Sequence, residues 1–209
     1  MSPAEAVLGF TAAAAVLTVL PGLDTALVLR TAAIEGPRRA ALAGLGIVIG
    51  CLVWGSAVAV GLGALLTASQ AAFTVLKWTG AAYLLWLGIG LLRRPRRTFD
   101  PGAEVAGLTG GEFDWMRRGL ITNLLNPKIG VFYISFLPQF MAQGVPAGPF
   151  LVLLAAIHGL LGAAWFAALI IATQPLAKAL RRPGVVAWLD RVTGGVFIAF
   201  AARLALGKN

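Results

Sequence analysis

Six long apolar runs follow one another along the chain, separated by short connections that hold most of the charged residues. A helix needs about 20 apolar residues to cross the hydrocarbon core of a bilayer. The pattern therefore predicts an all-α integral membrane protein in which residues 1–209 form one transmembrane domain. The six predicted spans are about Ala6 to Leu29, Ala41 to Leu66, Ala72 to Leu92, Gly119 to Met141, Pro149 to Thr173 and Val192 to Leu206. The last run is short and contains Arg203, so five spans are the alternative.

The composition agrees with a membrane protein and argues against a soluble one. Hydrophobic residues make up 59% of the chain and charged residues 12%, whereas soluble domains carry roughly 45–50% and about 25%. The net charge of +9 would suggest nucleic acid in a soluble protein. Here the cations cluster in alternate connections between apolar runs, which instead indicates orientation in a membrane.

Lys and Arg occur after the first, third and fifth runs, while the connections at 67–71 and 142–148 contain none. Because positively charged loops stay in the cytoplasm, we expect the basic loops inside and both termini outside.

The chain divides into two similar halves, about 1–95 and 116–209, joined by a glycine-containing hydrophilic linker at about 93–118. Lys77-Trp78-Thr79-Gly80 in the first half corresponds to Arg191-Val192-Thr193-Gly194 in the second. The first and fourth runs also share an internal proline beside polar residues. Since each half has three spans, the second half would be inverted, an arrangement found in many secondary transporters.

The first polar cluster is Pro21-Gly22-Leu23-Asp24-Thr25, with apolar residues on both sides. Pro21 and Gly22 should break the helix and free backbone carbonyls. Asp24 follows the break. It could cap the second half-helix, or it could bind a substrate ammonium or exchange a proton.

The second cluster is Asn123-Leu124-Leu125-Asn126-Pro127-Lys128. Asn126 precedes a proline and is a natural N-cap for a helix that restarts at Pro127. Lys128 would lie in the first turn of that helix, where the dipole disfavours a cation. An anion could offset this, either Asp24 or a substrate carboxylate, or the side chain could reach the headgroups. An acid and a base at two such breaks would suit a zwitterion, or would pair when no substrate is bound.

His158, the single histidine, lies in the fifth run and either forms a hydrogen bond between helices or relays protons. The single cysteine, Cys51, lies in the second run and is expected to pack there. Neither has neighbours at metal-ligand spacing, so no metal site or cofactor is predicted.

These motifs resemble the LysE/RhtB family of bacterial amino-acid exporters. The family's Pro-Gly-Pro-Asp motif is present as Pro21-Gly22-Leu23-Asp24, with leucine in place of the second proline, and its Asn-Pro-Lys motif is intact at residues 126–128. The resemblance implies efflux of an amino acid across the bacterial cytoplasmic membrane in exchange for protons. It implies substrate and coupling roles for Asp24 and binding or structural roles for Asn126, Pro127 and Lys128. We extend the expected site to Thr25, Asn123 and His158.

Lys128 already supplies one positive charge, and the apolar runs hold no second acid for a cationic side chain. A small neutral substrate of the threonine, homoserine or leucine type is therefore expected, with a basic amino acid as the alternative. A cation or metal permease is a further alternative. A membrane-embedded enzyme is not expected, because its nucleophile and base, or paired acids, are missing. Glycine-rich faces suit packing within the chain or in a homo-oligomer equally.

Overall fold

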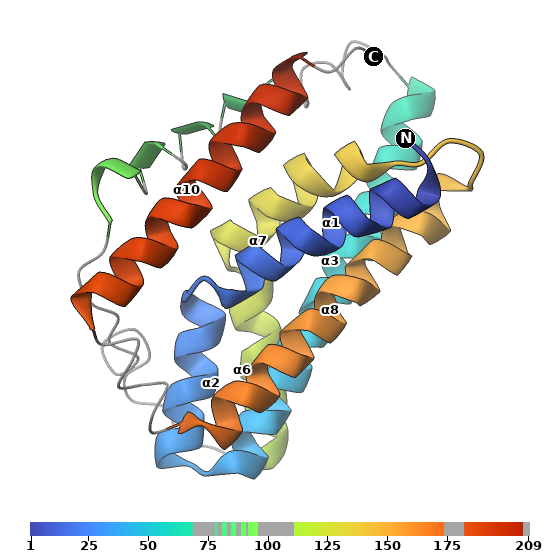
Figure 1. Ribbon diagram of the computed structural model, residues 1–209. Helices are drawn as coiled ribbons and strands as arrows, with labels where there is room; N and C mark the ends of the chain where they lie inside the picture. The colour runs from blue at the N-terminus through green and yellow to red at the C-terminus, as the bar shows by residue number, and fades with distance from the viewer. Residues whose placement is uncertain are drawn as a thin grey trace.

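The computed structural model describes residues 1–68, 78, 81–82, 85–86, 89–90, 92–95, 111–173 and 182–206. All regular structure in these residues is helical (Figure 1). The elements are α1 (Pro3–Val19), α2 (Leu23–Ile34), α3 (Pro37–Ala68), α6 (Glu112–Leu124), α7 (Pro127–Val131), a π-helical turn η1 (Phe132–Phe136), a 3₁₀ turn η2 (Leu137–Phe140), α8 (Ala147–Ile171) and α10 (Pro183–Leu206).

Two described helices are by themselves long and apolar enough to cross a membrane: Pro37–Gly61 of α3 and Ala147–Ile171, which is α8. Two bent pairs qualify if each counts as one span. The first joins α1 to α2 at 53°, and the second joins α6 to the α7–η2 segment at 55°. The described residues thus contain two to four candidate spans. Most of the predicted third span lies outside them.

Both helix breaks lie where the sequence places them. α1 ends at Val19 before Pro21, and α2 begins at Leu23 with Gly22 as its N-cap. Leu23 is the first residue of α2, a position where proline is favoured but not required, so the break forms without the family's second proline. In the second half, Asn126 caps α7 as predicted: its Oδ1 accepts a hydrogen bond from the Lys128 backbone N–H at 3.1 Å.

Several predicted boundaries were wrong, because the helices continue beyond their apolar runs. α10 begins at Pro183 rather than Val192, and α3 at Pro37 rather than Ala41. The predicted linker also ends early, since residues 112–118 form the start of α6. Hydropathy detects the apolar part of a helix, whereas its polar ends extend into the headgroups or water. The arginines assigned to loops therefore lie in helices: those at 38 and 39 in the first turn of α3, those at 117 and 118 in the middle of α6, and that at 191 inside α10.

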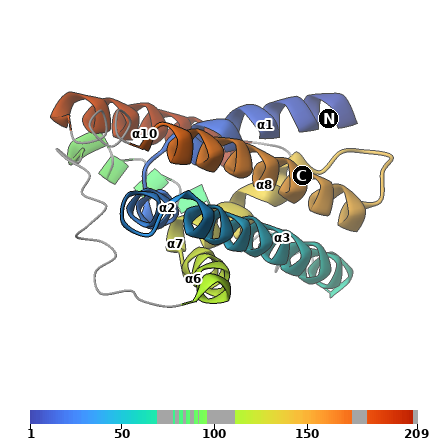
Figure 2. The same ribbon diagram turned by 90° about the horizontal axis from the view of Figure 1, so that it is seen from below.

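α3 packs closely against α6 and α8 (Figure 2). A Cβ on Gly46 of α3 would lie 1.9 Å from the carbonyl oxygen of Met116 in α6. A Cβ on Gly119 of α6 would lie 2.0 Å from the carbonyl oxygen of Ala43 in α3. On the other side, a Cβ on Gly55 would lie 2.2 Å from the Ala155 Cβ of α8. Only glycine permits these approaches, which fix α3 between the two helices.

The bundle has two chemically different ends. The turn between α2 and α3, the start of α6 and the end of α8 lie at one end (Figure 1). The N-terminus, the end of α3 and the loop before α8 lie at the other. Arg38 and Arg39, in the first turn of α3, therefore lie toward the first end.

Candidate functional site

The two helix breaks lie against each other and exchange hydrogen bonds. The Nζ atom of Lys128, in the first turn of α7, donates to the carbonyl oxygens of Leu17 at 3.2 Å and Leu20 at 2.9 Å, at the end of α1. In the reverse direction, Asn123 in the last turn of α6 donates from Nδ2 to Oδ2 of Asp24, in the first turn of α2, at 2.9 Å. The start of α7 thus binds the end of α1, and the start of α2 binds the end of α6.

The position of Lys128 follows from the chemistry of Pro21. In a continuous helix the N–H of residue 21 would donate to the Leu17 carbonyl, but proline has no N–H. The Lys128 ammonium supplies the missing donor, and its Nζ lies 3.5 Å from where a Cβ on Gly22 would be. The sequence interpretation considered an anion or the headgroups as partners for Lys128. The carbonyl oxygens freed by the first break are partners that it did not consider.

Asp24 does not cap α2, so the capping alternative was wrong. Gly22 is the N-cap and offers no side-chain acceptor, while Asp24 lies in the first turn. The carboxylate is buried, with 9% of the residue exposed, and the positive end of the α2 dipole favours its negative charge. Its Oδ2 accepts from Asn123, but its Oδ1 has no hydrogen-bond partner among the described residues.

The two asparagines complete this polar layer. Asn123 is fully buried and its Nδ2 also lies 3.6 Å from the Cys51 sulfur. Oδ1 of Asn126 accepts the hydrogen bond that caps α7. Two other amide atoms, Nδ2 of Asn126 and Oδ1 of Asn123, have no hydrogen-bond partner in the described part of the chain. Buried polar atoms are normally satisfied. Together with Oδ1 of Asp24, these two amide atoms therefore mark a place where a polar ligand or water can bind.

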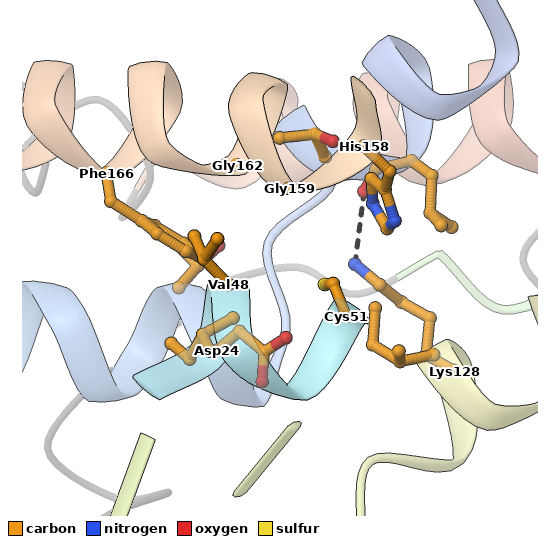
Figure 3. A pocket seen from close by; sticks show the side chains of 13 residues that line it. Asp24, Val48, Cys51, Lys128, His158, Gly159, Gly162 and Phe166 are labelled. Atoms are coloured by element: carbon orange, nitrogen blue, oxygen red, sulfur yellow. Dashed lines mark hydrogen bonds between the residues drawn. The ribbon is translucent and has the colours of Figure 1, made fainter. Parts of the chain in front are cut away.

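A pocket opens beside this layer, between α1, α2, α3, α7 and α8 (Figure 3). Figure 3 shows Lys128 and His158 at one end, Phe166 and Val48 at the other, and Asp24 between them. The volume open to the centres of water molecules is about 30 Å³. Since one water needs roughly 10–15 Å³ by this measure, this conformation has space for about two waters. The lining residues are Leu17, Thr18, Asp24, Thr25, Ile47, Val48, Cys51, Lys128, Ile129, His158, Gly159, Gly162 and Phe166.

The structure therefore brings Asp24, Thr25, Lys128 and His158 into one pocket and places Asn123 and Asn126 behind its polar side. His158 lies within hydrogen-bond distance of Tyr133, with Nδ1 and the hydroxyl oxygen 3.0 Å apart. This is the interhelical hydrogen bond that the sequence offered as one alternative.

Sequence reasoning missed Tyr133 and assigned Cys51 only to packing. Tyr133 lies within an aromatic run, where nothing in the pattern separates it from Phe132 and Phe136. Its position arises because η1 is a π-helical turn, which changes the direction of each side chain relative to an α-helix. In the part of the chain that the structure describes, no group of three or more His, Cys, Asp or Glu side chains could hold a metal ion.

A protein-family model described as LysE type translocator matches residues 15–208. The chain belongs to the LysE type translocator family. Its members are transporters and not enzymes, and this chain is a multi-pass membrane protein.

The curated relatives match nearly the full chain. A leucine efflux protein of Enterobacter sp. (strain 638) is 30% identical, covering 90% of each chain. A homoserine/homoserine lactone efflux protein of Salmonella typhi is also 30% identical, covering 92% of each. An uncharacterized membrane protein of Pseudomonas aeruginosa is 35% identical, covering 90% of this chain and 88% of its own. No solved structure matches the chain.

Proposed function

We propose that this translocator exports a small neutral amino acid across the bacterial cytoplasmic membrane by proton antiport. The observation that carries the proposal is the pocket in which a buried carboxylate and an ammonium come from two different helix breaks. The efflux of leucine and of homoserine by the two named relatives supports an amino acid as cargo.

In this mechanism Asp24 binds the substrate ammonium. Its unpartnered Oδ1 accepts from the ammonium, while Asn123 holds Oδ2 in place. Burial makes a lone carboxylate costly, so Asp24 carries either the substrate or a proton. This exclusive choice couples outward movement of substrate to inward movement of a proton.

Lys128 binds the substrate carboxylate. To do so its ammonium exchanges the neutral Leu17 and Leu20 carbonyls for the oxygens of a carboxylate, so that both the donor and the acceptor of the new hydrogen bonds are charged. The unpartnered Nδ2 of Asn126 is a second donor for the carboxylate. Release of the two carbonyls loosens the end of α1 from α7, so binding and helix movement occur together.

Thr25 and His158 complete the proposed site. Thr25 offers a buried hydroxyl next to Asp24 for a hydroxyl-bearing substrate such as threonine or homoserine. His158 and Tyr133 form a buried polar pair at the Lys128 end and are proposed as a proton path into the pocket.

The proposal includes the membrane arrangement: six spans as two inverted repeats, basic loops in the cytoplasm and both termini outside. The similar bend angles of 53° and 55° at the two breaks support the repeat. So does the reciprocal bonding between the breaks, in which each start binds the other's end.

Transport in proteoliposomes tests the proposal. The wild type should move neutral amino acids such as threonine, homoserine and leucine faster than lysine or arginine, and an imposed pH gradient should accelerate export. Asp24→Asn keeps the shape of the site but removes the charge and the exchangeable proton, so it should lose gradient-driven flux at least tenfold. Glu35→Gln, an acid at the end of α2 outside the pocket, is the matched control. Undiminished gradient-driven flux in Asp24→Asn would remove Asp24 from the mechanism.

A further inference from the structure

The pocket has an apolar end whose residues have no part in binding the two charged groups. This end lies between α3 and α8, away from Lys128 (Figure 3). His158, Gly162 and Phe166 are four residues apart along α8 and so share one helix face. The α8 face therefore changes from polar to apolar along the length of the pocket.

An α-amino acid places three substituents other than hydrogen on one carbon. If Asp24 holds the ammonium and Lys128 the carboxylate, the side chain must occupy the remaining direction. Asp24 is the one acid among the described residues that line the pocket. The end near Phe166 therefore offers a charged side chain no opposite charge, whereas an aliphatic side chain loses water there at no electrostatic cost.

We infer that Ile47, Val48, Gly159, Gly162 and Phe166 form the side-chain subsite for the cargo, and that Gly162 and Phe166 set its size. The inference rests on the proposed function and specifies it: the cargo is a neutral amino acid whose side chain is limited in length by the Phe166 ring. Amino acids with charged side chains are excluded by the apolar lining.

The packing around Phe166 explains why these two positions control size. A Cβ on Gly162 would lie 3.7 Å from Phe166 Cε2, and one on Gly44 would lie 3.3 Å from Cδ2. The Phe166 ring thus lies close to Gly44 of α3 and to Gly162 of α8, and it closes this end of the pocket. Truncating it enlarges the subsite. An alanine at position 162 fits at ordinary contact distance and makes the subsite smaller.

The experiment measures counterflow of leucine and of alanine in the same proteoliposome preparations. The readout is the leucine-to-alanine rate ratio, which does not depend on the amount of folded protein. Gly162→Ala should lower the ratio and Phe166→Ala should raise it, each by about tenfold, the order of discrimination that one or two methylene groups provide in an apolar pocket. Gly61→Ala, on the exposed part of α3 with nothing within 4 Å, and Phe113→Ala, exposed on α6, are matched controls with no expected change.

Opposite shifts in the two variants support the subsite. A second outcome is that the wild type transports both amino acids while the leucine-to-alanine ratios of Gly162→Ala and Phe166→Ala stay within twofold of the wild-type ratio. In that case the subsite is wrong and the proposed function stands. If wild type moves no amino acid in the panel, the proposed function fails, and the subsite with it. If Phe166→Ala does not fold, Phe166→Leu provides a milder enlargement of the subsite. If neither Phe166 variant folds, the ratio measured for Gly162→Ala alone tests the subsite.

Discussion

Asn123 and Asp24 are 99 positions apart in the sequence, yet Nδ2 of the first lies 2.9 Å from Oδ2 of the second inside the protein. The contact joins the end of α6 to the start of α2, so it couples the two helix breaks directly. It also leaves the other carboxylate oxygen available for a ligand. The position of Asn123 depends in turn on α3, where Gly50 provides the space for its side chain.

A methyl group at position 50 should therefore displace Asn123 from Asp24. In Gly50→Ala the new Cβ would lie 2.5 Å from Asn123 Oδ1 and 2.9 Å from its Cβ. We expect a loss of about 1–3 kcal/mol of stability, the usual cost of overpacking, and a marked loss of transport. Thermal unfolding in detergent and counterflow measure the two effects.

Gly61→Ala is the control for this prediction, because it adds the same methyl group to the same helix in open space. It should leave transport unchanged and alter stability by no more than about 1 kcal/mol. Equal behaviour of the two variants would show that Gly50 has no special relation to Asn123.

Replacing Lys128 should remove recognition of the substrate carboxylate. Wild type should transport leucine much faster than leucinamide, which keeps the ammonium but lacks the carboxylate. In Lys128→Met the rates for the two compounds should become similar and low, because the ammonium that distinguishes them is gone. The variant should also lose about 1–3 kcal/mol of stability, since the Leu17 and Leu20 carbonyls lose a donor.

Arg117→Met removes a cation that is largely exposed on α6 and should preserve the leucine preference. A wild type that carries leucinamide as fast as leucine would contradict the assigned role of Lys128.

Pro21→Ala should reconnect the first helix break in part. The restored N–H at position 21 can donate to the Leu17 carbonyl and so competes with Lys128. We expect slower transport with stability equal to or above that of wild type, because the change adds a backbone hydrogen bond. Stability and counterflow measured on one preparation separate this outcome from simple misfolding.

Pro3→Ala is the matched substitution, since Pro3 is the first residue of α1, where a missing N–H is not needed. It should alter neither property. Normal transport by Pro21→Ala would show that the break does not need its proline.

Cys51 reports on opening of the pocket without any engineering, because the chain has one cysteine. The thiol lines the pocket and the residue is 5% exposed, so a small maleimide should react slowly. Saturating substrate should slow the reaction severalfold further by occupying the same space.

The control is a cysteine introduced at exposed Gly61 in a Cys51→Ser background. It should react quickly with the maleimide, at the same rate with and without substrate. Equal labelling of Cys51 with and without substrate would place the binding site elsewhere.

The sequence by itself determined the helical membrane class, the two breaks and the residues beside them. These follow from local physical chemistry: proline removes a backbone donor, asparagine caps a helix, and long apolar runs need lipid or a core. Local chemistry could not identify the partners of Lys128 and Asp24, because carbonyls of α1 and an amide of α6 become available only when distant helices pack. Local sequence patterns also could not predict the Tyr133–His158 contact or the apolar end of the pocket that Phe166 closes. Both depend on glycine-mediated approach of α3 to its neighbours and on the π-helical turn after α7, which only the tertiary structure decides.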